Sequence, residues 1–210
     1  MNEKFAVIDT ETNWDDDVMS IGVVIAEDNT YNALEEYYGI ITPAWLIGGM
    51  YSSVLRDGDT EINAESTRDQ ILREIRAMFQ KHGVRHLFAY NANFDKNHLP
   101  ELSDYAWADI MQTTMYRQYN PFIPDKADLC RTGKLRRGYD VESVLHMITG
   151  RHQYEVHNAL CDARDELFIM SSFEMRIQRF IANSNKSAAD RTRDYNNWLI
   201  GDLAKNDGLQ

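Results

Sequence analysis

The sequence predicts an α/β domain with a mixed sheet, in which three antiparallel strands are followed by parallel strands and helices flank the sheet. Three apolar, β-branched runs near the start of the chain are joined by short connections, as in an antiparallel meander. Helical patterns and short strand-like runs then alternate, which is typical of α/β domains. Only 4 prolines occur in 210 residues, so most of the chain can form regular structure.

Five short apolar segments have the composition of buried strands. They span residues 5–8, 18–26, 34–41, 86–90 and 108–110. The first segment ends at Asp9, and Asn29 with Thr30 indicates a turn between the second and third segments. Because the connections are short, we expect the first three strands to pair antiparallel.

Apolar residues at helical spacing predict three helices in the remainder of the chain. They run from the Ser66–Asp69 capping signal to Gly83, from Asp140 to Met147 with Gly150 as the stop, and from Asn158 to Ile181. A polar break at residues 183–187 follows the last of them. Beyond this break, apolar residues between 195 and 203 recur at helical spacing and predict a small docking helix.

Composition and charge limit the class of protein. Apolar residues make up 43% and charged residues 26% of the chain, as in a globular domain. No run approaches the ~20 apolar residues of a membrane span. The first residues have no basic region followed by a long apolar run, so we expect no secretory signal there. With two cysteines and no disulfide framework, we expect a cytoplasmic protein without a membrane partner. The net charge of −11 disfavours tight duplex binding, although divalent cations can mask carboxylates.

Three short motifs carry the candidate chemistry. Asp9 and Glu11 lie two residues apart at the end of the first strand, so their side chains point to the same face. Asp95 follows a later strand, and His157 stands in a loop five residues before Asp162. Singly, these residues have ordinary explanations as a solvated strand end, an N-cap and a helix-dipole acid. In this order and context, they predict one site.

The combined pattern resembles the DEDDh 3′-to-5′ exonucleases of the ribonuclease H-like superfold. That family includes polymerase proofreading subunits, oligoribonuclease and ribonuclease T, and its motifs are a strand ending in D-x-E, then N-x-x-F-D, then H-x-x-x-x-D. The matching residues are Asp9/Glu11, Asn91/Phe94/Asp95 and His157/Asp162. Residues 18–24, with their glycine, and residues 139–145 also resemble family segments. The resemblance predicts an exonuclease domain at residues 1–182 and a C-terminal extension at 183–210.

The resemblance implies a hydrolase that uses two Mg²⁺ or Mn²⁺ ions to release nucleoside 5′-monophosphates from the 3′ ends of single-stranded DNA or RNA. Asp9 would bridge both ions. Glu11 and Asp162 would hold the ion that carries the attacking water, and Asp95 would support the second ion. His157 would be the general base, since the pKa of histidine lies near working pH.

Substrate contacts are expected on both sides of this site. The resemblance implies that the Thr10 backbone, Thr12 and Asn91 lie near the terminal nucleotide. Trp14 stands near the position of a family glycine, and either stacking on a base or local packing would explain it. A stretch without acids predicts a phosphate-binding surface, the alternative being a solvated loop. Its cations are Arg131, Lys134, Arg136 and Arg137.

Two other functions fit parts of the pattern. A catalytically silent subunit that binds nucleic acid ends would be expected to lack one of the acids or the histidine, and none is missing. A haloacid-dehalogenase-like phosphatase needs a second aspartate where Glu11 stands. The sequence does not distinguish DNA from RNA, nor a homodimer from a polymerase or repair partner. Residues 42–65 depart from the family pattern.

Overall fold

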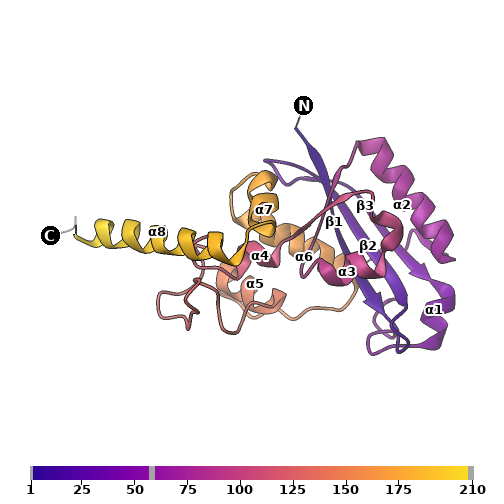
Figure 1. Cartoon of the computed structure of the whole chain (residues 1–210). Coiled ribbons are helices and arrows are strands. Elements are labelled where there is room, and N and C mark those ends of the chain that lie inside the picture. The colour runs from indigo at the N-terminus through magenta and orange to yellow at the C-terminus, as the bar shows by residue number, and fades with distance from the viewer. Residues whose placement is uncertain (1, 57–59, 208–210) are drawn as a thin grey trace.

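The computed structural model describes residues 2–56 and 60–207, and it confirms the mixed α/β sheet flanked by helices (Figure 1). The described residues form a six-stranded sheet in the order β4-β3-β2-β1-β5-β6. The strands are β1 (Lys4–Thr12), β2 (Val18–Glu27), β3 (Ala33–Ile41), β4 (Ala64–Ser66), β5 (His86–Ala89) and β6 (Ala106–Asp109). The helical elements are α1 (Thr42–Ile47), α2 (Arg68–His82), α3 (Asn93–His98), the short 3-10 helix η1 (Pro100–Leu102), α4 (Met111–Thr114), α5 (Val141–Thr149), α6 (Ala159–Ser172), α7 (Ile177–Ser184) and α8 (Ala188–Asp207).

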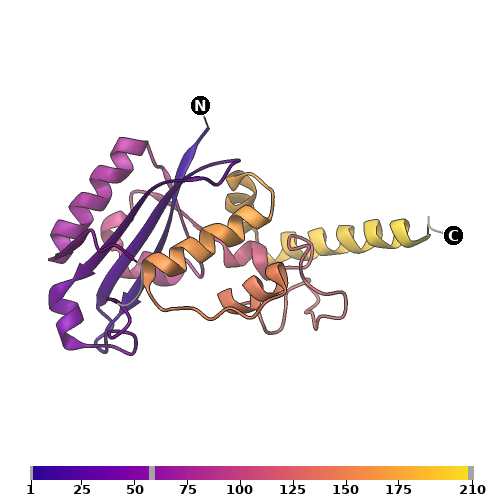
Figure 2. The ribbon, with the colours of Figure 1, turned by 180° about the vertical axis from the view of Figure 1, so that it is seen from behind.

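The central strands are buried because helices cover both faces of the sheet. β1, β2 and β3 pair antiparallel as expected, and β5 and β6 continue the sheet parallel to β1. α2 packs against β2, β3 and β4, whereas α6 packs against β1, β2 and β3. Figure 2 shows α6 across the face of the sheet that is turned away in Figure 1. Burial on both faces explains why the strand sequences are continuously apolar and do not alternate between apolar and polar residues.

A glycine allows α6 to lie directly on the sheet. Gly22 pairs with Asp9 in the register of β1 and β2. A Cβ atom at Gly22 would lie 2.1 Å from the carbonyl carbon of Ala159, far inside van der Waals contact. Only glycine permits this approach without a shift of the backbone. The first turn of α6 is thereby held next to the strand that carries Asp9 and Glu11.

The prediction of a single long helix at residues 158–181 is wrong, because the helix is interrupted between α6 and α7. The Asp28 carboxylate, which is fully buried, accepts a hydrogen bond from the Ile177 backbone N–H at 3.0 Å and forms an ion pair with Arg176. Glu174 has a φ of +50° in the connecting turn. Asp28, in the turn between β2 and β3, therefore caps the N-terminus of α7. Local periodicity does not reveal a cap that comes from so distant a residue.

Smaller differences concern element ends. The N-cap of α2 is Thr67, whose hydroxyl accepts from the Gln70 N–H, because Ser66 belongs to the edge strand β4. That edge strand was not predicted. The first strand extends past Asp9 to Thr12, so that both acids of its motif lie within the strand.

α8 is longer than the predicted docking helix and projects away from the sheet (Figure 1). Its first turns are anchored by Arg191, which is 5% exposed and donates to the backbone oxygens of Gln112 and Asn183. Asp194 accepts a hydrogen bond from the Tyr119 hydroxyl. Residue 182, the predicted end of the exonuclease domain, lies within α7, which ends at Ser184. Among the helices of the described ranges, none combines the length and apolarity needed to cross a bilayer.

Candidate active site

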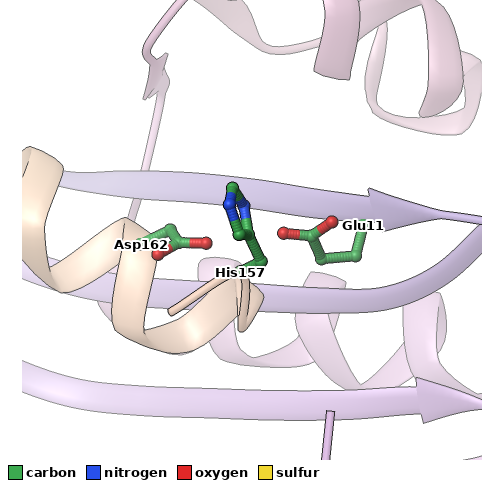
Figure 3. A group of neighbouring side chains, drawn as sticks. All are labelled: Glu11, His157 and Asp162. Atoms are coloured by element: carbon green, nitrogen blue, oxygen red, sulfur yellow. The ribbon is translucent and has the colours of Figure 1, made fainter. Parts of the chain in front are cut away.

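The predicted acids meet at one end of the sheet. β1 supplies Asp9 and Glu11, whose side chains share a face, and the first turns of α6 supply Asp162. Figure 3 shows Glu11, His157 and Asp162 turned toward one another. One ligand atom from each of these three residues lies within 4.8 Å of those of the other two. Two distant segments of the chain thus supply neighbouring ligand atoms.

Asp95 reaches the site from α3 and is held by Thr10. The Thr10 hydroxyl donates to Oδ1 of Asp95 at 2.8 Å, and both side chains are buried. Successive strand residues alternate in direction, so Thr10 points away from the face that Asp9 and Glu11 share. The structure therefore gives the Thr10 side chain a positioning contact with a site acid.

Burial and mutual repulsion disfavour the charged forms of these acids. Burial is the largest cause in each case, and it raises the pKa of Glu11 to about 7 and that of Asp162 to about 8. Glu11 and Asp162 share a hydrogen bond that raises the pKa of Asp162 and lowers that of Glu11. The pKa values of Asp9 and Asp95 are also raised by burial, and for Asp9 further by the charge of Asp95.

The donor set fits hard divalent cations. Carboxylate oxygens are the ligands that Mg²⁺ and Mn²⁺ prefer. Oδ1 of Asp162 is buried, and within residues 2–56 and 60–207 it has no hydrogen-bond partner. An uncompensated buried oxygen among like charges is the arrangement that a bound cation relieves. Asp9, Glu11, Asp95 and Asp162 are the residues that would hold such ions.

His157 is positioned by its backbone and by an aromatic neighbour. Its φ of +57° places it in the left-handed region just before α6. Its ring stacks on that of Tyr51, with ring centroids 3.7 Å apart and planes 16° apart. Partial burial lowers the pKa of His157 below its ordinary value, so the ring is neutral at neutral pH. A neutral imidazole beside carboxylates can accept a proton.

Two cavities flank the carboxylates. The larger, about 620 Å³, is bordered by Asp9, Asn91, Arg136 and Arg137 among others. Asn91 has a φ of +61°, a left-handed conformation that asparagine tolerates well. The smaller, about 310 Å³, is a partly aromatic cavity beside Glu11. Its lining residues are Thr10, Glu11, Thr12, Asn13, Trp14, Met50, Tyr51 and Phe94.

The cationic stretch is divided by the structure. Arg136 and Arg137 border the larger cavity, whereas Arg131 and Lys134 do not. Lys134 instead lies over the ring of Tyr139, 4.8 Å from its centroid. Arg136 pairs with Asp128 at 3.1 Å, and both side chains are more than half exposed. An exposed pair of this kind contributes about 0–1 kcal/mol, so Arg136 can exchange it for a phosphate.

Sequence reasoning missed two further acids and one aromatic residue. Glu155 and Glu166 border the larger cavity together with Asp9. Glu166 stands one helical turn after Asp162, on the buried face of α6 among apolar residues. A charged residue on an otherwise apolar helix face is the signal that could have found it. Tyr51 lies in a segment that departs from the family pattern, and no motif marks it.

Comparison with known proteins connects this geometry to one structural group. No protein-family model and no curated protein matches the sequence. A solved structure of exonuclease X in complex with 5′-overhanging duplex DNA matches with a TM-score of 0.52 and 15% identity, over 86% of this chain and 99% of the other. The nuclease domain of a 3′-exonuclease described as a DEDDh family member, bound to rAMP, matches with a TM-score of 0.58 and 13% identity, over 86% and 94%.

Escherichia coli exonuclease I in complex with a dA16 oligonucleotide matches with a TM-score of 0.51 and 14% identity, over 86% of this chain and 42% of the other. At such low identities, the similarity concerns the arrangement of the backbone. The chain therefore has the ribonuclease H-like fold of the DEDDh-type 3′-exonucleases.

Proposed function

We propose that this protein is a 3′-to-5′ exonuclease that depends on two divalent cations and releases nucleoside 5′-monophosphates from single-stranded nucleic acid. The observation that carries the proposal is the convergence of Glu11, His157 and Asp162 within 4.8 Å, beside Asp9 and Asp95, in a fold shared with 3′-exonucleases. An end-binding subunit without activity would not need all five residues. The likeness to exonucleases also disfavours the phosphatase alternative.

The chemistry assigns each residue a task. When bound, two Mg²⁺ or Mn²⁺ ions supply Lewis-acid activation and stabilise charge at the scissile phosphate. When ions are bound, Asp9 would contribute to both, Glu11 and Asp162 would hold the first, and Asp95 would support the second. His157 takes a proton from the attacking water through a ring nitrogen, which requires the neutral form that its lowered pKa provides.

The two cavities suggest where a single strand would lie. The smaller cavity offers the Trp14 and Phe94 rings, which are 66% and 39% exposed, as stacking surfaces for the terminal base. Thr12 lines the same cavity. The scissile phosphate would then lie over the carboxylates, and the preceding phosphates would meet Arg136 and Arg137 in the larger cavity. Structural neighbours were solved with oligonucleotide or nucleotide bound, which supports a nucleic acid substrate.

The test is digestion of matched DNA and RNA oligonucleotides that carry a label at either end. We expect 3′-labelled substrate to release labelled mononucleotide with Mg²⁺ or Mn²⁺, and 5′-labelled substrate to shorten one nucleotide at a time. EDTA should stop the reaction. Asp9→Ala and Asp162→Ala should abolish turnover while the protein remains folded, since removing one of several repelling carboxylates relieves repulsion. Wild-type turnover by either purified variant would contradict the assignment.

A further inference from the structure

Glu166 is a buried carboxylate that the mechanism above does not use. It lies on α6 one turn after Asp162 and is only 2% exposed. It borders the larger cavity together with Asp9. The charge of Glu166 acts on Asp9 more strongly than that of Glu11 or Asp162, second only to that of Asp95. Glu166 is therefore next to the candidate metal ligands and not on a separate surface.

The carboxylate of Glu166 is not compensated by the protein. Its Oε2 atom is buried and, throughout the described part of the chain, has no hydrogen-bond partner. A hydrogen bond from the Tyr90 backbone favours its charged form. Among the side chains of residues 2–56 and 60–202, no ion pair within 4.0 Å joins Glu166 to a lysine, arginine or histidine. The charges that act on it most strongly are those of Asp95, Asp162 and Glu155, all acids, and it acts in turn on Asp9.

An arrangement of this kind is expensive unless a cation is present. Leaving a buried acceptor without a partner costs about 1–3 kcal/mol, and more when the group is charged. Apolar residues surround Glu166 on α6, so a leucine or methionine would pack there without this penalty. The presence of a carboxylate here, bordering the cavity beside Asp9, is explained if a cation binds its unpartnered oxygen.

We propose that Glu166 is a fifth metal-ligating carboxylate, which joins Asp9 and Asp95 around the second divalent cation. This inference rests on the proposed function. The resemblance assigns only Asp95 and the shared Asp9 to that ion, and a further anionic oxygen would hold it more tightly, since carboxylate count tunes the affinity of oxygen sites. The chain would then retain its second ion between turnovers.

The test measures binding of Mn²⁺ alone, without nucleic acid, by isothermal titration calorimetry on the full chain. Glu166→Gln removes the charge with little change of volume. We expect the affinity of one Mn²⁺ binding event to fall by at least about 10–100-fold, the range found when groups that only support a metal's ligands are removed. The rise in melting temperature that Mn²⁺ induces should shrink in parallel.

The control is Asp165→Asn on the same helix. It removes one charge at the neighbouring position, and Asp165 does not border the cavity. Because the charge of Asp165 acts on Asp162, we expect a small loss of Mn²⁺ affinity, well short of that in Glu166→Gln, so that a general loss of negative charge is separated from loss of a ligand. Should Glu166→Gln fail to fold, Glu166→Asp withdraws the oxygen by one methylene, and the same loss of affinity is expected.

Wild-type Mn²⁺ affinity in Glu166→Gln, or in Glu166→Asp if that variant is used, would overturn the inference and make Glu166 a structural, protonated acid. Failure of the proposed function looks different. In that case the wild type would bind Mn²⁺ but release no mononucleotide, and the binding comparison would still decide the role of Glu166.

Discussion

At the scale of single residues, the site is a cluster of carboxylates that the fold buries away from solvent. Asp9, Glu11, Asp95 and Asp162 all have a raised pKa, with burial as the main cause. Such a cluster favours protons or cations over the empty, ionised state. The same property that attracts divalent ions therefore makes the metal-free protein sensitive to pH.

We expect the free energy of unfolding of the metal-free protein to fall as the pH rises from about 5 to about 8. A carboxyl whose pKa is higher in the folded than in the unfolded chain binds more protons when folded. Its contribution is full below the unfolded pKa and is lost as the pH rises through the folded pKa, which is about 7 for Glu11 and about 8 for Asp162. Urea unfolding in EDTA across this range measures the slope.

Two comparisons sharpen that measurement. Asp162→Asn should flatten the slope, because the carboxyl with the higher pKa, about 8 against about 7 for Glu11, no longer titrates. Mg²⁺ should raise stability most at the alkaline end, where the carboxylates are ionised and bind it best. Metal-free stability that rises with pH over the same range would show that these acids are not buried as described.

His157→Ala should lower kcat by about 10²–10⁴-fold, the usual contribution of a positioned general base. Because burial lowers the pKa of His157, the wild-type rate should rise with pH through a pKa below 6.5. In the variant, this limb of the profile should disappear while Mn²⁺ binding persists through the carboxylates. The pH–rate profile of both proteins under single-turnover conditions measures it. An alanine variant with an unchanged profile would mean that another group is the base.

At the scale of elements, the site depends on how closely α6 approaches the sheet. Gly22→Ala should destabilise the protein by about 1–3 kcal/mol, as overpacking a tight contact does, since its Cβ atom would overlap the Ala159 backbone. The shift of α6 should also lower activity. Chemical unfolding and oligonucleotide digestion measure the two effects.

Gly201→Ala on α8 is the matched control, because a Cβ atom there meets nothing within 4 Å. The higher helix propensity of alanine, about 1 kcal/mol better than that of glycine, should leave this variant as stable as the wild type or more so. Equal behaviour of Gly22→Ala and Gly201→Ala would refute the close packing of α6.

The elements also show what the sequence can reveal. Asp9 and Glu11 are found because a strand places residues two apart on one face, and Gly83 and Gly150 are found because helix ends are local. The break between α6 and α7 cannot be found in this way, because Asp28, which caps α7 at Ile177, is 149 positions away in the sequence. Contacts of this kind depend on the folded chain.

The site follows the same rule. The motif acids could be predicted from order and spacing, whereas Tyr51 against His157 and Glu166 beside Asp9 depend on packing between distant segments. The expected substrate contacts, the cytoplasmic location, the domain division at residue 182 and any homodimer or repair partner stay predictions.

At the scale of the whole molecule, a net charge of −11 must be reconciled with a polyanionic substrate. We expect only a few phosphates to be held, mainly by divalent cations and by Arg136 and Arg137. Each neutralised phosphate of a single strand contributes roughly −0.7 to the slope of log binding constant against log salt concentration. The slope should therefore be about −1.5 to −3. Arg136→Ala with Arg137→Ala should flatten the slope by about one unit and leave base preference unchanged.

Oligonucleotide affinity over a salt series, with Ca²⁺ in place of Mg²⁺, measures this slope. Arg131→Ala with Lys134→Ala is the matched control, because these cations do not border the cavity. If the slope of the Arg136 and Arg137 double variant equals that of the wild type, the positive surface lies elsewhere.

α8 gives the molecule an extended outline (Figure 1). Its 20 residues span about 30 Å at 1.5 Å per residue. Arg191 anchors its first turns, and the Arg117 guanidinium lies over the Trp198 ring near its middle. A rod attached to a compact body increases friction in water far more than it increases mass. On a size-exclusion column, a single chain of 24.4 kDa would therefore elute ahead of compact proteins of equal mass. Light scattering, which reports molar mass independently of shape, is the measurement that counts its chains.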